Sequence, residues 1–386
     1  MRILQVHCHY RETGGEDVAV AQEAALLRAA GHELEQVLVE NPRTTAASAR
    51  DLALAPWNPR AARRVVDTAE RFRPDVVHVH NTWFGISPAV FAALRAAGYP
   101  VVATLHNYRT ACATGVLLRQ GAVCELCVGS HPGHAVVHGC YRGSRLLSVP
   151  AALTVAVARR RGVWRRDVRR FFVPEEASGP RLVAGGIPPN LVVVHPHFVE
   201  DPGPRPHPPS ASGEVVFAGR LSPEKGAHVL LQAWRKAAPP GLTLTVYGDG
   251  PQRSALEALA GPNVVFAGHT ARTAVASHLQ CARALVFPST CLESGLAPVE
   301  ALANGTPVVA SNLVGMAPRV TAVGAGWSSR AGDVTDLARS LGQLGHDDDV
   351  DAAGRAARRL YEVRHTPAAA LRQLEETYQS VTSPRG

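Results

Sequence analysis

The chain has 386 residues, which is too long for one ordinary hydrophobic core and suits two domains. Its apolar content of 46% argues against intrinsic disorder, and no window approaches the 18 unbroken apolar residues of a membrane span. The net charge of +8 comes from the first half, where 23 Arg face 15 acids up to residue 198, whereas 17 cations balance 17 acids beyond it. The first half should therefore meet an anionic partner, such as a phospholipid surface or a lipid-linked acceptor.

The first half alternates apolar runs of strand length with amphipathic helical patterns. It opens on a strand pattern without a cleavable leader, so we expect a cytoplasmic protein, with the inner face of the membrane as its anionic surface. The predicted elements are strand 2–6, helix 19–30, strands 34–39 and 76–80, helix 88–97 and strand 101–105. This alternation is typical of a parallel, doubly wound sheet and predicts an α/β, Rossmann-like domain over residues 1–198.

Glycines and histidines mark the ends of these strands. Gly14 and Gly15 follow the first strand, where a glycine pair lets a phosphate or sugar approach the backbone closely. The histidines are His7, His9, His78, His80 and His106. His7 and His9 are two residues apart, and so are His78 and His80, so the members of each pair share one face of a strand. Such pairs also suit a metal-dependent hydrolase. We find no carboxylate at ligand spacing beside either pair, which argues against that hydrolase.

Seven cysteines in a chain without a secretion signal should stay reduced. Four fall in a loop-like insert over residues 110–142, namely Cys112, Cys124, Cys127 and Cys140. The C-x-x-C spacing of Cys124 and Cys127 is that of zinc ligands, and zinc would fasten a segment with little apolar sequence to bury. Two interpretations stay open, a structural tetrathiolate zinc or free thiols in a surface loop. Neither is catalytic, because a zinc bound by four thiolates has no open position.

Residues 158–172, ARRRGVWRRDVRRFF, predict a basic helix with an apolar stripe. The stripe consists of Trp164, Val168, Phe171 and Phe172. Such a helix either lies on an anionic bilayer or packs its stripe against the sheet and leaves the arginines solvated. No aromatic stacking platform accompanies the charge, so we do not expect nucleic acid as a partner.

Residues 199–213 hold five prolines and predict the interdomain linker. A second Rossmann-like domain is expected over 214–365, followed by a helix within 366–386 that crosses back to the first domain. Its first strand runs into a glycine turn, Gly219 to Gly226, that carries Arg220 and Lys225 ahead of a helix. An arginine fork and a lysine ammonium on such a turn suit a diphosphate.

The stretch from Pro288 to Val309 should organise the second domain's site. A loop must emerge there from the end of the buried strand 284–287, where open α/β sheets bind ligands. The backbone N–H groups of Gly295, Leu296 and Ala297 at the following helix start suit an anion. Glu300 and Glu293 supply carboxylates that can accept hydrogen bonds from vicinal hydroxyls, as in a nucleotide sugar.

These two stretches, Gly219–Gly226 and the tail EALANGTPVVA from Glu300, resemble the donor-site motifs of the retaining GT-B glycosyltransferases of the glycogen-synthase-like, family-four type. The resemblance covers nearly the whole chain and implies two Rossmann-like domains facing across a cleft. One departure is that this family places seven residues between its two glutamates, whereas six separate Glu293 from Glu300 here.

The resemblance implies a role for each motif. Arg220 and Lys225 would clamp the diphosphate of a nucleotide-sugar donor without a catalytic metal, Glu300 would hold the ribose, and Glu293 with His106 would orient the hexose. The turn at Gly248 would lie near the nucleotide, and the pair Gly14-Gly15 would touch donor and acceptor. The expected function is retaining transfer of a hexose to an acceptor that the sequence does not identify.

Two other functions stay open. Because the loop between Glu293 and Glu300 is one residue shorter than in the family, the chain would also suit an adaptor that binds a nucleotide sugar at anionic membranes and has weak catalytic activity. A metal-dependent hydrolase would instead use the histidine pairs and lose activity to chelators.

Overall fold

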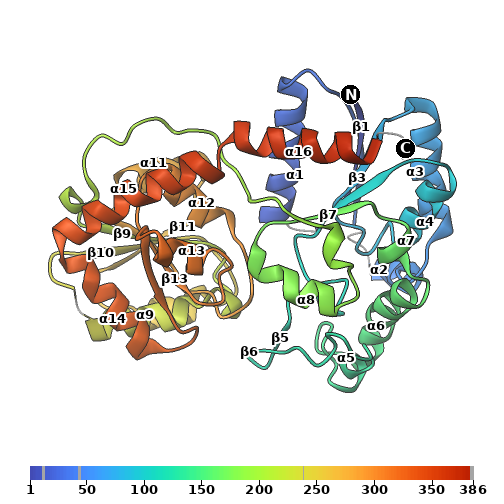
Figure 1. Cartoon of the computed structure of the whole chain (residues 1–386). Helices are drawn as coiled ribbons and strands as arrows, with labels where there is room; N and C mark the ends of the chain where they lie inside the picture. The colour runs from blue at the N-terminus through green and yellow to red at the C-terminus, as the bar shows by residue number, and fades with distance from the viewer. Residues whose placement is uncertain (11–13, 42–44, 238, 383–386) are drawn as a thin grey trace. The chain divides into compact units, whose positions relative to one another are not determined.

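The computed structural model describes residues 1–10, 14–41, 45–237 and 239–382, which divide into two compact units (Figure 1). The N-terminal unit comprises Met1–Arg119, Cys124–Pro196 and the chain from Ala370 on, and the C-terminal unit comprises Gln120–Val123 and His197–Ala369. Each unit holds one six-stranded parallel sheet. The predicted α/β fold with two Rossmann-like sheets is therefore confirmed.

The N-terminal sheet has the strand order β2-β1-β3-β4-β7-β8 and is parallel throughout. Its strands are β1 (Arg2–His9), β2 (Glu33–Glu40), β3 (Val76–Val79), β4 (Val101–Thr104), β7 (Arg170–Val173) and β8 (Val192–Val194). Every residue of β3 and β4 is buried, as expected for central strands covered on both faces. The carboxyl ends of β1, β3 and β4 lie side by side, so the histidines that end them meet.

Helices flank this sheet, and a two-stranded hairpin lies within the cysteine-rich insert. The helices are α1 (Gly15–Ala29), α2 (Thr45–Leu54), α3 (Pro59–Phe72), α4 (Ala89–Ala96), α5 (His134–Val137), α6 (Arg145–Arg160), α7 (Val163–Arg166), α8 (Gly179–Ala184) and α16 (Pro367–Thr382), and the hairpin is β5 (Leu118–Arg119) with β6 (Ala122–Val123). Leu374 and Tyr378 of α16 are fully buried in one core with Ile3, Leu27 and Val76. The end of the chain therefore completes the core of the unit that its beginning forms.

The helix predicted over residues 158–172 is wrong. Helix α6 ends at Arg160, Gly162 takes a left-handed φ of 64°, and residues 170–173 form β7, which pairs with β4. Phe171 and Phe172 are fully buried, and Trp164 and Val168 are buried as well. The apolar stripe is therefore core, as in the second of the two interpretations above, while five arginines around it stay exposed. Among the described helices, none is both long and apolar enough to cross a bilayer.

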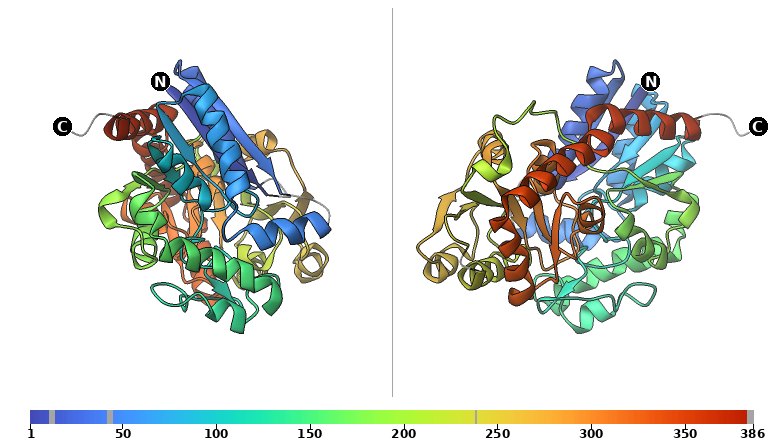
Figure 2. Two further views of the ribbon diagram at one scale, coloured as in Figure 1. Left: turned by 90° about the vertical axis from the view of Figure 1, so that its right-hand side faces the viewer. Right: turned by 60° about the vertical axis from the view of Figure 1, so that its left-hand side comes forward.

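The C-terminal sheet has the order β11-β10-β9-β12-β13-β14 and is also parallel throughout. Its strands are β9 (Glu214–Ala218), β10 (Thr243–Tyr247), β11 (Val264–Gly268), β12 (Ala284–Phe287), β13 (Val308–Ser311) and β14 (Gly326–Ser329). Successive residues point to opposite faces, so Val215 and Val216 belong to separate hydrophobic cores. Helices cover both faces (Figures 1 and 2).

These helices are α9 (Ala227–Ala237), α10 (Arg253–Leu259), α11 (Arg272–Cys281), α12 (Leu296–Ala303), α13 (Ala317–Ala322), α14 (Val334–Gly342) and α15 (Asp347–Arg364). Helix α12 begins just after Gly295, which has a φ of 46°, and its buried face carries Val299 and Leu302. It packs against α15 and α11, so its first turn has a fixed position at the carboxyl end of β12.

The proline-rich segment 199–213 is bound along the C-terminal unit. It contains only a short 3-10 turn at Pro209–Ala211. The Arg205 guanidinium donates to the carbonyls of Ala282 (2.9 Å) and Gly305 (3.0 Å), and the Tyr361 hydroxyl donates to the Val199 carbonyl (3.1 Å). Because prolines lack an N–H, side-chain donors such as Arg205 of the segment and Tyr361 of the unit provide much of its attachment.

Candidate functional site

The loops that follow β9, β10 and β12 meet at the carboxyl end of the C-terminal sheet. The Leu221 N–H donates to the Asp249 carbonyl (2.9 Å), which joins the first two loops. The Thr290 N–H donates to the Glu224 carbonyl (2.8 Å), which joins the first to the third. The structure therefore brings together the glycine turn and the glutamate loop, which are more than 60 residues apart in sequence.

Lys225 and Glu293 form an ion pair between the first and third of these loops. Their side chains are 24% and 16% exposed, so both reach the surface, and the Ser289 hydroxyl also donates to Glu293. Burial opposes the charge of the Lys225 ammonium, but the Glu293 carboxylate outweighs burial and raises the lysine pKa. Lys225 is therefore a permanent cation at this edge.

Glu293 has a firmly held backbone. Its carbonyl accepts from the Gly315 N–H (2.9 Å), and it forms a β-bridge with Val314 in the loop after β13. The loop that carries Glu293 and Glu300, which is one residue shorter than in the resembling family, is therefore attached to the loop after β13. Leu296 and Ala297 form the first turn of α12, where unpaired N–H groups favour an anion.

Glu300 is paired with Arg272 at the start of α11. The Glu300 side chain is 11% exposed and Arg272 is 37% exposed. Sequence reasoning missed Arg272, although an arginine that follows the β11 turn and begins a helix is a recognisable signal. A carboxylate has two oxygens, so the pair orients Glu300 and leaves acceptor capacity for hydroxyl groups.

Arg220 lies exposed on the β9 turn, beside two tightly placed glycines. The Gly219 N–H donates to the Tyr247 carbonyl (3.0 Å), and the Gly248 N–H donates to the Gly268 carbonyl (2.8 Å). The turns after β9, β10 and β11 are therefore stacked in one row. Arg220, Gly219 and Gly248 belong to the same surface as Lys225.

In the N-terminal unit, α1 brings a carboxylate to the first histidine pair. Asp17 Oδ1 lies 2.9 Å from both His7 Nε2 and His9 Nδ1, and Asp17 Oδ2 accepts from the Gly14 N–H (2.8 Å). Burial alone would raise the pKa of Asp17, but these hydrogen bonds outweigh it and lower the pKa to about 2. The glycine pair is thus anchored to β1. Residues 11–13, which precede the glycine pair, lie outside the described residues.

The second histidine pair also has a carboxylate from α1, Glu23. Glu23 Oε1 lies 2.9 Å from His78 Nδ1 and 3.2 Å from His80 Nε2. Burial opposes ionisation of Glu23, but the two imidazoles outweigh it and hold its pKa well below the usual range. His80 Nδ1 lies 3.1 Å from His106 Nε2, so a buried carboxylate is connected to His106 through one imidazole.

The prediction that no carboxylate accompanies the histidine pairs is therefore wrong, because ligand spacing in sequence does not reveal side chains from a neighbouring helix. Glu23, His78 and His80 are all buried, which leaves no access for a hydrolase substrate. In the group of His7, His9 and Asp17, only His9 is appreciably exposed. Hydrogen bonds within the protein account for both groups.

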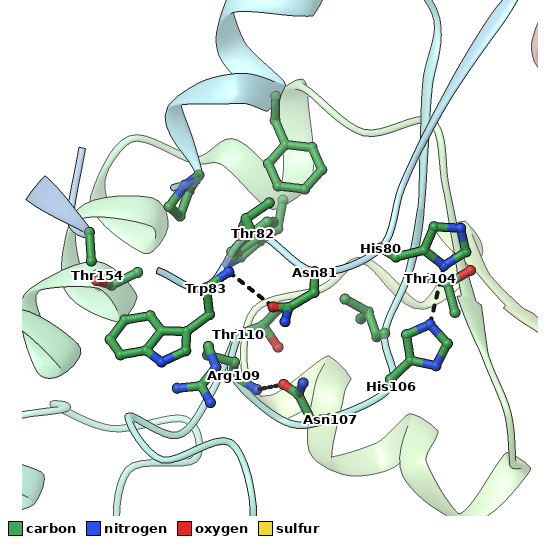
Figure 3. A pocket seen from close by; sticks show the side chains of 15 residues that line it. His80, Asn81, Thr82, Trp83, Thr104, His106, Asn107, Arg109, Thr110 and Thr154 are labelled. Atoms are coloured by element: carbon green, nitrogen blue, oxygen red, sulfur yellow. Dashed lines mark hydrogen bonds between the residues drawn. The ribbon is translucent and has the colours of Figure 1, made fainter. Parts of the chain in front are cut away.

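A small cavity of about 50 Å³ lies beside His106 at the ends of β3 and β4 (Figure 3). Its polar lining includes Asn81, Asn107 and Thr110, and the Arg109 guanidinium lies 4.4 Å from the ring centre of Trp83. The Thr110 hydroxyl is buried and makes no hydrogen bond to any described residue. A space of this size holds a few water molecules or a small polar group.

Glu16 is a further titratable group that sequence reasoning missed. It follows the glycine pair and accepts from the Tyr10 hydroxyl (3.0 Å) and the Asn107 amide (3.4 Å). Burial raises its pKa to about 7, against the opposing hydrogen bond from Tyr10. Its position directly after Gly15 was the available signal.

The four cysteines predicted as zinc ligands are free thiols within one part of the N-terminal unit. Burial raises the pKa of Cys127 to about 11, and the nearby thiols of Cys112, Cys140 and Cys124 add to the rise. Among described residues, no group of three ligand atoms within 4.8 Å of one another includes a cysteine. The structure therefore does not support the zinc site, because C-x-x-C spacing alone does not bring the other two thiols to ligand distance.

Two family models match separate parts of the chain. The model described as "Glycosyltransferase Family 4" matches residues 13–201, and the model described as "Glycosyl transferases group 1" matches residues 212–347. The first range covers Glu23, His78, His80 and His106. The second covers the loops with Lys225, Glu293 and Glu300. Together they span most of both units.

Two proteins are similar to this chain in sequence, and a third is similar in structure. The chain is 30% identical over 299 residues to a glycogen synthase of Mycobacterium tuberculosis, covering 75% of this chain and 64% of that protein. It is 29% identical over 393 residues to a phosphatidyl-myo-inositol mannosyltransferase of Mycolicibacterium smegmatis, covering 96% of this chain and 91% of that one. The crystal structure of Anabaena HepE with UDP and glucose superimposes with a TM-score of 0.65, at 20% identity, covering 98% of this chain and 100% of HepE. The last likeness concerns the fold.

Proposed function

Because the chain belongs to the GT-B glycosyltransferases of family four, we propose that it is a retaining enzyme that transfers a hexose from a nucleotide-diphosphate sugar. The observation that carries the proposal is the cation Lys225, held by Glu293 where the β9 and β12 loops meet. The names of the similar proteins, a glycogen synthase and a mannosyltransferase, support a hexose donor. The UDP and glucose held by HepE support a nucleotide-sugar donor.

Lys225 and Arg220 neutralise the diphosphate in this proposal. An ammonium has three N–H donors, so Lys225 can keep one on Glu293 and turn the others toward phosphate oxygens. The N–H groups at the start of α12 add partial positive charge. Negative charge grows on the diphosphate as the glycosidic bond breaks, and these fixed donors stabilise it without a catalytic metal.

Glu300, oriented by Arg272, holds the ribose hydroxyls, while Glu293 and His106 orient the hexose. Retention follows from attack of the acceptor on the face that the diphosphate leaves, with a phosphate oxygen taking the acceptor's proton. The acceptor is anionic or lipid-linked, which the arginine excess of the first half supports. The name of the phosphatidyl-myo-inositol mannosyltransferase is consistent with that class. A cytoplasmic location at the inner membrane face follows from such an acceptor.

Lys225→Ala tests the clamp. Loss of one preorganised cation should lower kcat/KM for transfer or donor hydrolysis about 100-fold, because the departing diphosphate loses its main counter-charge. The measurement is release of labelled sugar from a panel of nucleotide sugars by the purified chain. Lys236, the only other lysine, is exposed on α9, so Lys236→Ala is the matched control and should leave the rate unchanged.

Wild-type turnover by the Lys225→Ala protein would remove the clamp from the mechanism. If the wild-type chain binds a donor, seen as a raised melting temperature, yet never releases labelled sugar, the adaptor function is favoured instead. Activity that chelators abolish would favour the hydrolase.

A further inference from the structure

Helix α6 buries mostly small residues and exposes three large apolar side chains. Its buried positions are Ser148, Ala151, Ala152, Thr154, Val155 and Ala158, and Leu147 is partly buried beside them. The side chains of Leu146, Val149 and Leu153 face the other way, with 79%, 38% and 47% exposed. These three are spaced three and four residues apart, so they form one stripe on the helix surface.

An ordinary surface helix buries its leucines, whereas α6 exposes Leu146 and Leu153. Of the eleven large apolar side chains exposed among the described residues, five lie between residues 126 and 153. Single exposed leucines need no explanation, but an apolar stripe along one helix indicates an interaction surface.

Exposed arginines are frequent in the sequence on both sides of the stripe, and residues 138–170 contain no exposed acid. Between residues 138 and 170, seven arginines are exposed, namely Arg142, Arg145, Arg160, Arg161, Arg165, Arg166 and Arg169. The only acid in this range is Asp167, which is buried and bound by Arg95 (2.5 Å). Two of the arginines, Arg145 and Arg160, lie on α6 on the same side as the stripe.

We propose that this face of α6, defined by Leu146, Val149 and Leu153 with Arg145 and Arg160, docks on an anionic phospholipid surface. The leucines would enter the boundary between headgroups and acyl chains, while the arginine heads stay at the phosphate level and their stems cover apolar surface. This docking does not depend on the proposed transfer reaction.

The charges favour a membrane over other partners. A second copy of the chain on this face would bring two arginine clusters together, and like charges oppose such a contact. Nucleic acid would satisfy the arginines but has no apolar surface for the leucine stripe. An anionic bilayer satisfies both features at once.

The test is flotation of the full chain with phosphatidylcholine vesicles that contain or lack phosphatidylglycerol, at about a third of the lipid. We expect binding to the anionic vesicles only, weakened by salt. The double variant Leu146→Gln/Leu153→Gln should bind at least tenfold more weakly. Its matched control is Val363→Gln on α15, where the side chain is 80% exposed, and this variant should bind like wild type. Because these side chains are exposed, the changes should leave folding intact.

The arginines are tested separately. Arg145→Gln/Arg160→Gln should also weaken binding at least tenfold, whereas Arg60→Gln/Arg64→Gln, exposed on α3 of the same unit, should not. Equal binding to neutral vesicles, or wild-type binding by the leucine variant, would overturn the proposal. So would a leucine variant that changes only the oligomeric mass in light scattering, because the face would then be a contact between copies.

Discussion

His80 has a partner on each ring nitrogen, and these partners decide where its proton lies. Burial lowers the pKa of His80 to about 4, so the ring is neutral at pH 7. Two groups lie 3.2 Å from Nε2, the Glu23 carboxylate, which can only accept, and the Gln5 amide nitrogen, which also donates to Glu23. A hydrogen bond to a charged carboxylate is stronger than one between neutral groups, so we infer that the Nε2 proton of His80 goes to Glu23 while the Gln5 amide donates to Glu23 as well. His80 then accepts at Nδ1 from His106 Nε2. Figure 3 shows the hydrogen bond between His80 and His106, and through this bond Glu23 would set the tautomer of His106.

Glu23→Gln tests this connection. An amide can donate as well as accept, so it no longer determines the His80 tautomer, and His106 loses its defined orientation. We expect kcat to fall about 10- to 100-fold with little change in KM for the donor, as for other residues that orient a functional imidazole. Steady-state kinetics with the best donor are the measurement. Glu33→Gln, on the exposed end of β2, is the control and should have no effect.

If Glu23→Gln changes KM and kcat alike, or only lowers the melting temperature, then Glu23 stabilises the core and does not orient His106. A melting curve of each variant distinguishes these results.

At the scale of elements, the loops of the C-terminal unit depend on one close approach. Gly226 has a φ of 70°, and a Cβ there would lie 2.1 Å from the Pro288 carbonyl oxygen. The Lys225 loop and the glutamate loop can meet only because this position has no side chain. The ion pair of Lys225 and Glu293 depends on that contact.

Gly226→Ala should therefore destabilise the chain by about 3 kcal/mol or more, because a backbone loop must move in addition to the strain of a left-handed residue. Gly241→Ala is a matched control, since Gly241 has a φ of 72° and a Cβ at that position would have nothing within 4 Å. That control should cost about 1 kcal/mol. Urea unfolding gives both free energies, and equal values would mean that the loop contact carries no constraint.

Helices α6 and α7 show how an element can be misread from its pattern. The apolar spacing of residues 164–172 fits a helix, but the last part enters β7, since its residues pair with β4. The apolar stripe that is exposed to solvent lies earlier in the chain, at Leu146, Val149 and Leu153. Periodicity alone cannot distinguish an apolar face in the core from one at the surface.

At the scale of the whole molecule, the end of the chain belongs to the unit that the beginning forms. Tyr378 on α16 is fully buried beside Phe172, and its hydroxyl lies 2.8 Å from His78 Nδ1, across 300 residues of sequence. The buried histidine network and the terminal helix are therefore one structure.

Tyr378→Ala should destabilise the N-terminal unit by about 3–5 kcal/mol, because a large buried ring leaves a cavity. Tyr378→Phe keeps the ring and removes one hydrogen bond, so it should cost about 1 kcal/mol. Urea unfolding followed by circular dichroism measures both. Near-equal stability of Tyr378→Ala and wild type would show that α16 is dispensable for this core.

The sequence by itself determined the two parallel sheets and the motif loops, because strand and helix periodicity, glycine turns and the resemblance at Gly219–Gly226 and Glu300 are local in the chain. The tertiary structure decided which side chains meet: Asp17 and Glu23 with the histidines, Arg272 with Glu300, and Lys225 with Glu293. It also decided against a tetrathiolate cluster among the described residues and turned Leu146 and Leu153 of α6 outward. These contacts join residues on different elements, and local spacing carries no information about the direction from which a neighbouring element approaches.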